Sequence, residues 1–307
     1  MTPRLPLTRA AARSKTSGYI RLASTAPWRA AAMAAGLLAM GAASAQEALP
    51  LWEAGAGVSV VDFPHYRGSD QRHTYVLPLP YFIYRGDVLK VDRQGLRGLL
   101  FDSQRVELDL SVNGSVPVDS ADNRARQGMD DLDPTLEIGP SLNVHLAGAE
   151  GEHTQLDLRL PLRAVIASNF RHVRHAGWIF QPQLNLDVRH PFGAQGWNLG
   201  LAAGPIFSDR RYNDYFYGVS PADATAERPA YRAGGGYAGT QFIAALSKRF
   251  DSTWFGAFVK ADTLRGAVFD DSPLVKQRTS FTAGVGFAWI FAVSDRRVAL
   301  PAANAAR

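Results

Sequence analysis

The chain has 307 residues, of which 46% are hydrophobic, 10% aromatic and 20% charged, and it contains no cysteine. The lack of cysteine excludes a disulfide framework, thiolate metal sites and thiol catalysis, and the hydrophobic content excludes a disordered chain. The formal net charge of +5 suggests nucleic-acid binding, but residues 1–45 hold six of the 33 basic residues and no acidic residue. The remaining 27 basic and 28 acidic residues give a net charge of −1, so no nucleic-acid partner is expected.

The first 45 residues have the pattern of a secretory signal peptide. A basic stretch ends at Arg29, an apolar run follows over 30–43, and Ala43-Ser44-Ala45 fits an A-x-A cleavage site. The apolar run is long enough for a signal core and short for a membrane-spanning helix; a membrane anchor or an amphipathic start is the alternative. The sequence therefore predicts cleavage after Ala45 and export to the envelope of a Gram-negative bacterium.

After residue 50 the dominant hydrophobic period is two. In Val106-Glu-Leu-Asp-Leu-Ser-Val-Asn113 apolar and polar side chains alternate, and the same pattern recurs over 136–145, 156–163 and 178–189. Strict alternation indicates β-strands with one apolar and one polar face. Soluble sandwiches and barrels bury the apolar face, whereas transmembrane barrels place it against lipid.

Strand length separates these two architectures. Several runs have ten to fourteen residues, whereas strands of soluble sheets have about five or six and a tilted membrane strand needs roughly nine to eleven. Aromatic residues also gather near the ends of runs, as in the interfacial girdles of outer-membrane barrels. They are Trp52, Tyr75, Tyr84, Trp178, Phe192, Trp197, Phe207, Trp254, Trp289 and Phe291. The sequence predicts an all-β fold, a transmembrane antiparallel up-and-down β-barrel spanning 46–291 in the outer membrane.

About twelve strands are expected. In chain order they cover residues 52–62, 75–84, 88–93, 96–101, 105–113, 134–146, 154–166, 177–189, 197–208, 238–250, 253–263 and 279–291. The intervals between them are alternately short and long, as expected for short periplasmic turns and longer outside loops, except at the tight Gln94-Gly95 tip. The last strand carries a row of large apolar side chains from Phe281 to Phe291 on one face and small residues on the other. Residues 292–307 are expected to form a disordered periplasmic tail.

Charged residues on the polar faces of neighbouring strands are expected to point into the barrel. They are Glu107, Asp109, Glu137, Asp157, Arg159, Arg163, Asp187 and Arg189. One interpretation is a charged constriction that selects solutes; the other is a salt-bridge network that fills a narrow barrel. The mixture of signs favours the network, because a selective channel more often lines one wall with a single sign.

The segment 209–237 is rich in tyrosine and arginine. Such residues suit stacking on sugars or docking a partner, but a loop folded into the lumen and held by tyrosine hydroxyls and arginines is favoured, because long barrel loops often fill the lumen. Two of its blocks, Asp214-Tyr-Phe-Tyr-Gly-Val-Ser220 and Tyr231-Arg-Ala-Gly-Gly-Gly-Tyr-Ala238, resemble the signature of the MipA/OmpV family. The residues that carry this motif are Tyr215, Phe216, Tyr217, Gly218, Val219, Tyr231, Arg232, Gly234, Gly235, Gly236 and Tyr237.

The beginning of the mature chain resembles the same family. Gly55-Ala-Gly-Val58, Tyr66-Arg-Gly-Ser-Asp70 and Leu77-Pro-Leu-Pro-Tyr81 are similar to its N-terminal pattern, and the likeness extends from Trp52 to Phe291. The resemblance implies an outer-membrane barrel. One family member is a scaffold for murein synthesis that bridges a membrane-bound lytic transglycosylase and a bifunctional murein synthase, and others are described as porin-like or as adhesins.

The expected function is therefore a non-enzymatic scaffold for murein-synthesis and murein-remodelling enzymes, in contact with outer-membrane lipid and lipopolysaccharide. The alternative is a narrow porin-like channel for small solutes. The resemblance carries over no catalytic residues, and no cofactor is expected.

Two further clusters give weaker signals. Arg171-His-Val-Arg-His175 lies near Ser168 and Asn169, which are residue types that a barrel hydrolase would need, but their spacing gives no geometric support. Contact of the two arginines with lipopolysaccharide phosphate is as plausible, and a solvated loop is favoured over both. The two histidines have no nearby carboxylate, and the aspartates of 114–133 lack calcium-loop spacing, so no catalytic or metal site is predicted.

Overall fold

The computed structural model describes residues 48–85, 89–92, 95–98, 101–103, 105–148, 153–169 and 171–299. The predicted signal peptide, its cleavage site and Gln94 lie outside these ranges. The strands are β1 (Ala48–Pro50), β2 (Trp52–Pro64), β3 (Arg72–Arg85), β4 (Leu89–Asp92), β5 (Gly95–Gly98), β6 (Phe101–Asp102), β7 (Val106–Ser115), β8 (Thr135–Ala147), β9 (Thr154–Ser168), β10 (Val173–Phe180), β11 (Gln183–Arg189), β12 (Trp197–Ser208), β13 (Gly236–Arg249), β14 (Thr253–Thr263), β15 (Thr279–Val293) and β16 (Arg297–Ala299).

Helical structure is limited to short segments. They are α2 (Arg210–Tyr217) and the 3-10 turns η1 (Ser120–Asp122) and η2 (Pro191–Gly193). None of the helices in the described ranges is long and apolar enough to cross a membrane.

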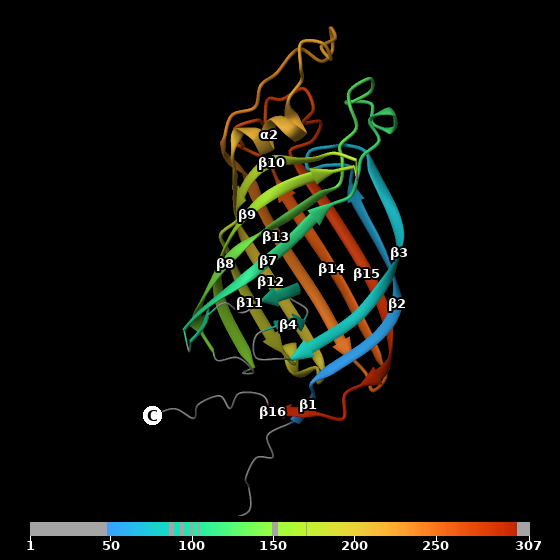
Figure 1. Cartoon of the computed structure of the whole chain (residues 1–307), viewed down its shortest axis with the longest axis vertical. Helices are drawn as coiled ribbons and strands as arrows, with labels where there is room; N and C mark the ends of the chain where they lie inside the picture. Colours follow the sequence, from blue (N-terminus) through green and yellow to red (C-terminus); the bar gives the residue numbers. More distant parts are fainter. Residues whose placement is uncertain are drawn as a thin grey trace, which may run out of the picture. The chain divides into compact units, whose positions relative to one another are not determined.

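β1 and β16 pair in a separate two-stranded ribbon, and the other strands form one curled sheet in which neighbouring strands are antiparallel (Figure 1). The order is β5-β4-β3-β2-β15-β14-β13-β12-β10-β9-β8-β7-β6, and β5 also contacts β7, which brings the two ends of the order together. β10 and β11 both pair with β9 and β12, so they act as one strand interrupted at Gln181 and Pro182. The predicted antiparallel up-and-down barrel is confirmed.

The predicted strands agree with the observed ones except at three places. The run 177–189, predicted as one strand, is divided into β10, which begins at Val173, and β11. The runs 88–93 and 96–101 appear as the short strands β4, β5 and β6. The chain after Phe291 also differs from the expected disordered tail, because β15 continues to Val293 and β16 pairs with β1. Residues 300–307 lie outside the described ranges.

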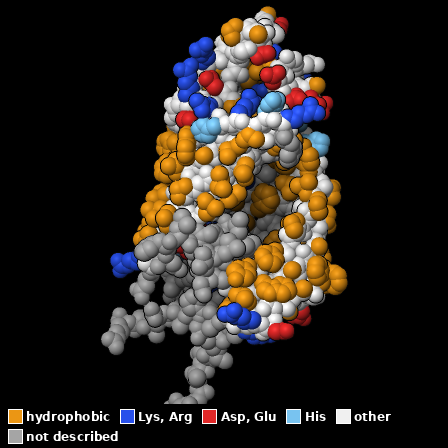
Figure 2. Space-filling view, viewed as in Figure 1, with side chains coloured by type: hydrophobic (Ala, Val, Ile, Leu, Met, Phe, Trp, Pro, Cys, Tyr) orange, Lys and Arg blue, Asp and Glu red, His pale blue; other side chains and the backbone are white. Residues whose placement is uncertain are grey.

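The outer face of the barrel is apolar. Figure 2 shows hydrophobic side chains covering the middle of the barrel, with charged side chains gathered over the loops. Phe281, Phe287 and Trp289 are exposed on the outer face of β15, as predicted from its alternation. The predicted aromatic girdle is wrong for two residues whose strand positions face the interior. Trp254 on β14 packs against Tyr81 in a buried cluster inside the barrel, and Tyr75 lies on the same face of β3 as Tyr81.

The two ends of the barrel differ. At one end, called the loop end, lie the long connections 65–71, 116–134, 209–235 and 264–278; at the other, called the turn end, lie the short connections and the β1–β16 ribbon (Figure 1). Four of the five long connections predicted from the sequence lie at the loop end, but the fifth, predicted at 167–176, is a short connection there, because β9 continues to Ser168 and β10 begins at Val173.

Candidate functional site: a polar lumen beneath a loop cap

The four long connections pack together into what we call the loop cap, and α2 is its centre (Figure 1). Asp209 begins the helix, because its side chain accepts the backbone N–H of Tyr212 at 2.9 Å. Gly218 ends it by donating its N–H to the Asp214 carbonyl. The Asp214 carboxylate also accepts the N–H of Ala233 at 2.7 Å, which joins the two blocks of the family-like motif.

Aromatic side chains fill the interior of the cap. Tyr217 stacks on Phe269 with ring centroids 3.8 Å apart, and Phe269, Leu264 and Leu274 are fully buried. The Tyr217 hydroxyl donates to the Arg67 carbonyl at 2.9 Å. Because burial raises the pKa of Tyr217 to about 12, this hydroxyl keeps its proton at neutral pH and remains a donor.

Two buried arginines tie the loops to one another through backbone carbonyls. Arg126 donates to the carbonyl of Phe216 at 3.3 Å, which links the loop 116–134 to α2. Arg228 donates to the carbonyls of Ala125 and Gln127 at 3.0 Å each. The cap therefore has the composition of a small soluble core, with apolar packing inside and satisfied polar groups around it.

A band of hydrogen-bonded side chains crosses the lumen where the cap meets the strands, and we call it the polar belt. It starts with Glu137 on β8, whose carboxylate lies 2.9 Å from Nε of Arg163 on β9. Arg163 also donates to Gln181 at 2.8 Å and to Ser111 at 3.2 Å. Both members of the ion pair are more than nine-tenths buried, so their mutual bonding replaces the water that they lose.

The polar belt continues across β13 and β14. Gln181 donates to Gln241 at 2.9 Å, and Gln241 donates to Asp262 at 3.1 Å. Asp262 lies 3.2 Å from Nε of Arg67, which comes from the loop cap, and 3.7 Å from Lys260. Arg67 also donates to the Ala238 carbonyl at 2.6 Å, so the cap is anchored to the strands at this point.

Two cavities lie in the lumen. The larger, about 360 Å³, is lined by Glu107, Asp157, Arg159, Asp187 and Arg189 among others. The second, about 280 Å³, is lined by residues that include Asp109, Ser111 and Arg163. Both cavities include Asn143, Arg159 and Gln183 in their walls, so they adjoin.

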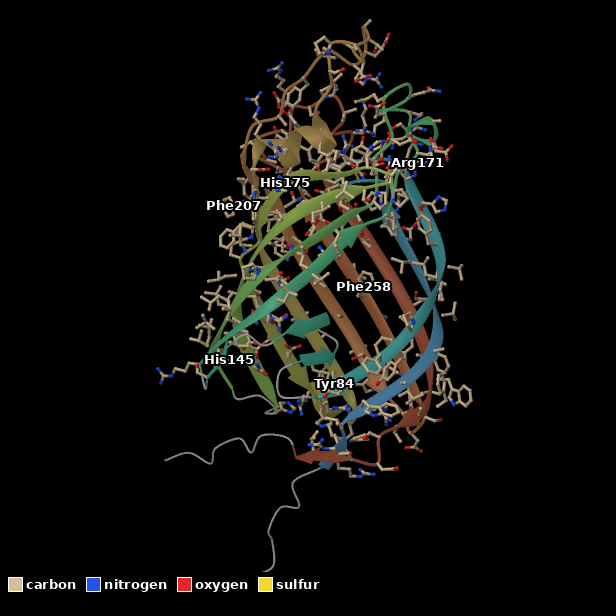
Figure 3. The ribbon with its side chains drawn as sticks, in the orientation of Figure 1. Tyr84, His145, Arg171, His175, Phe207 and Phe258 are labelled. Carbon is tan, nitrogen blue, oxygen red and sulfur yellow. The ribbon has the colours of Figure 1, made fainter. Side chains whose placement is uncertain are left out.

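Hydrogen bonds organise the charges around these cavities. Asp157 is paired with Nδ1 of His145 at 2.7 Å and accepts two bonds from Gln155. Asn143 donates to Asp109 at 2.9 Å. Figure 3 shows His145 low on the barrel, near the turn end. The eight charged residues selected from the sequence are thus brought to one lumen, seven in the cavity walls and Glu137 in the polar belt.

The motif residues lie in the loop cap and at the start of β13. Tyr215, Phe216 and Tyr217 belong to α2, Gly218 follows it, and Val219 bridges to Tyr231. Arg232, Gly234 and Gly235 follow in the loop, and Gly236 and Tyr237 begin β13.

The weaker clusters have structural contacts. Asn169 accepts the backbone N–H groups of Arg171 and His172 and so shapes the turn, and His175 lies 2.9 Å from an Arg211 nitrogen. Asp119 caps η1 and Asp131 accepts the N–H of Ser120. Figure 3 shows Arg171 and His175 at the loop end. Within the described ranges, no group of three His, Asp or Glu residues is placed to hold a metal ion.

Several residues of the site were missed by the sequence analysis. Gln241 and Asp262 occupy inward positions of predicted strands, so the alternation could have identified them. Arg67 lies in the Tyr66–Asp70 block that resembles the family's N-terminal pattern, but no role was predicted for it, and Phe269 lies in a loop where no local signal marks it.

Comparisons with known proteins place this arrangement among outer-membrane proteins. Residues 54–291 match the model of the family described as MltA-interacting protein MipA. The chain is 25% identical over 232 residues to outer membrane protein Omp26La of Vibrio anguillarum, covering 73% of this chain and 81% of the relative. It is also 25% identical over 224 residues to OmpV of Vibrio cholerae (68% and 76%) and 26% identical over 242 residues to the putative outer membrane protein YiaT of Escherichia coli (77% and 89%). An outer-membrane channel from Pseudomonas putida F1 aligns with a TM-score of 0.38 and 13% identity, over 81% of this chain and 98% of that one.

Proposed function

This chain belongs to the MipA family of outer-membrane proteins, and from that premise we propose that it is a non-enzymatic scaffold for murein enzymes. The turn end would face the periplasm and bind a lytic transglycosylase, with a murein synthase as a second partner. The loop end would face outward. The family's description as MltA-interacting supports a lytic transglycosylase as the first partner.

The structural observation that carries this proposal is an exposed aromatic side chain on a strained turn. Phe192 in η2 is fully exposed, and both Phe192 (φ 55°) and His190 (φ 51°) have left-handed backbone conformations. Such conformations are costly for residues other than glycine and concentrate at functional sites. An exposed aromatic ring on a fixed turn is the kind of anchor that dominates protein–protein interfaces.

The test is affinity capture with the folded barrel against a periplasmic and membrane extract of its own organism. Recovery of a lytic transglycosylase or a murein synthase by the unmodified chain, and its loss with Phe192→Ala, is the expected result. Phe250→Ala is the matched control, because Phe250 is an exposed phenylalanine at a different turn. Equal recovery of these enzymes by all three proteins would remove Phe192 as the anchor, and failure to recover either enzyme would overturn the scaffold.

The second candidate is a narrow channel for small solutes, and the two adjoining lumen cavities favour it. In this case the loop cap limits conduction, so loosening it should raise the conductance of the barrel in a planar bilayer. The variant Phe269→Ala removes the ring that stacks on Tyr217. A bilayer that shows no conductance with either the unmodified barrel or this variant would exclude the channel.

A further inference from the structure

Among the described residues, β3 is paired along nearly the whole of one edge but at only two positions of the other. On one side, β3 pairs with β2 from Arg72 to Tyr84. On the other side, its only pairs within the described ranges are Tyr84 with Val91 and Arg85 with Lys90 of β4. The edge of β3 from Arg72 to Ile83 therefore has no strand partner among the described residues.

β7 has the same asymmetry. It pairs with β8 along its whole length, but with β6 only at Leu108 and Glu107. From Asp109 to Ser115, its other edge pairs with no strand of the described part of the chain. The two free edges belong to the strands on either side of the short β4–β5 hairpin, as Figure 1 shows.

The length of the hairpin explains why it does not fill this space. Asp92 of β4 pairs with Gly95 of β5, so the hairpin turns back within two residues, about level with Ile83 of β3. Only twenty residues, 86–105, separate β3 from β7, whereas β8 and β9 have 13 and 15 residues each. Among the described residues, an opening therefore remains in the barrel wall between β3 and β7, and Figure 2 shows a hollow on this face of the barrel.

One wall behind the opening is apolar. Leu77 and Leu79 lie on the same, inward face of β3 as Tyr81. Phe258 of β14 and Val61 both lie against Gly284. Leu79 fills the space next to Gly286 in the same way. Figure 3 shows Phe258 inside the barrel, between β7 and β3 in that view. An apolar surface of this kind inside a membrane barrel suits an acyl chain.

The smaller lumen cavity, which lies beside the free edge of β7, is polar and carries unsatisfied groups. Asp109, the first residue of the free edge of β7, is 3% exposed, and its Oδ1 has no hydrogen-bond partner among the described residues. Nε of Arg159, which lines the same cavity as Asp109, also has no hydrogen-bond partner among the described residues. Asn143 is the register partner of Arg159 on β9, and its side chain donates to Asp109. The unpaired oxygen of Asp109 and the unpaired Nε of Arg159 therefore lie on either side of Asn143.

We propose that this opening admits a single-chain zwitterionic lipid from the membrane and that the lumen binds it. Its acyl chain lies against Leu77, Leu79 and Phe258, its cationic amine contacts Asp109, and its phosphate contacts Arg159. Backbone groups without a strand partner, like those that the described residues leave along the free edges of β3 and β7, are tolerated at membrane depth where they line a cavity that contains water. A lipid head group in the lumen is compatible with such a cavity. This inference does not depend on the scaffold function.

The test uses the intact barrel and palmitoyl lysophosphatidylethanolamine, titrated by native mass spectrometry. One saturable site is expected, and its dissociation constant should rise about tenfold or more in Phe258→Ala, since a buried phenyl ring contributes that much or more. The matched control is Phe255→Ala, on the same strand with outward parity. Equal affinity in both variants, or no saturable site, would overturn the proposal.

Two further arms test the head group and the route. Asp109→Asn should weaken binding of the lysophosphatidylethanolamine but not that of lysophosphatidylglycerol or palmitate, because the amide no longer repels an anionic head group; tighter binding of either anionic probe than of lysophosphatidylethanolamine to the unmodified barrel would overturn the zwitterionic assignment. In nanodiscs, a probe with a photoreactive group at its chain end should label Leu77, Leu79 or Phe258. Labelling confined to outward residues such as Phe255 would exclude access through the wall.

Discussion

At the loop end, buried space is filled by aromatic and aliphatic side chains from four loops, whereas the polar belt directly below is made of charged and amide side chains, most of them from strands. The loops lie outside the membrane, so they can bury apolar residues as a soluble domain does. The strands that carry the polar belt place their apolar residues mainly against lipid, so the alternation leaves polar residues for this part of the interior. Those residues must satisfy one another, and the polar belt is how they do so.

The largest effect should come from the apolar region. Replacing Phe269 with alanine removes a fully buried ring stacked on Tyr217 and should cost about 4 kcal/mol of stability. Denaturant unfolding and hydrogen exchange of the α2 amides would measure it. Phe192→Ala, which removes an exposed ring, should change stability by less than about 0.5 kcal/mol. Equal losses in the two variants would show that the cap has no packed core of its own.

The polar belt should respond to the loss of one charge. Arg163→Gln leaves Glu137 buried without its cation and should cost about 3 kcal/mol. The double variant with Glu137→Gln should recover part of the loss, because no charge then remains unpaired. The exposed pair of Arg124 and Asp70 is the control, since its loss should cost about 0.5 kcal/mol or less. Additive losses in the double-mutant cycle would mean that Glu137 and Arg163 do not interact.

The junction between the two regions is tested at Gly177. This glycine has a φ of +123°, and a Cβ there would collide with Asp209 and with the backbone nitrogen of Tyr212 at the start of α2. Gly177→Ala should therefore cost about 2 kcal/mol, measured as faster hydrogen exchange in α2. Gly128, with a φ of +83° and open space around it, should cost about 1 kcal/mol when replaced by alanine. Similar costs at both positions would mean that strain alone accounts for the effect.

The smallest effect is a pH dependence of the cap. Burial lowers the pKa of His65 below its ordinary value of 6.5, and the positive charge of His73 adds to this. Neutral His65 can accept a hydrogen bond from Asn123 at 3.2 Å through Nδ1. Because the unfolded chain takes up the proton first, stability should decrease as the pH falls below about 6.5 and level off below the pKa of the folded state. Thermal unfolding of the unmodified chain and of His65→Gln should differ in this slope; parallel curves would assign the dependence to other groups.

The strands could be predicted from the sequence because their signal is local. Alternation in a run such as 106–113 specifies a strand, its faces and a membrane-spanning length without knowledge of its partners. The barrel, the outward row on β15 and the alternation of long and short connections all followed from this pattern. Trp254 was misplaced because its position near a strand end suggested an interface, while its parity places it inside.

A folded loop over 209–237 held by tyrosine hydroxyls and arginines was expected from the sequence, but the packing partners in the loop cap and the opening in the wall could not be predicted in the same way. Tyr217 and Phe269 are 52 positions apart in loops without periodicity, so nothing local indicates that they stack. The polar belt was predicted only in part, since Glu137 and Arg163 carry charges that stand out, whereas Gln181 and Gln241 are neutral amides. The short hairpin was visible as a tight tip at Gln94-Gly95, but its consequence depends on the register of β3 and β7.

The pairing of β1 with β16 has a consequence for how the chain can be rearranged. Ala48 lies opposite Ala299 in the β1–β16 ribbon, so the two ends of the described chain are neighbours at the turn end. A short linker could join them, and new ends could be opened in the connection between β8 and β9 without cutting a strand. The order in which strands leave the ribosome would then change while their order around the barrel stays the same. Such a circular permutant would separate the role of synthesis order from the role of strand pairing in assembly.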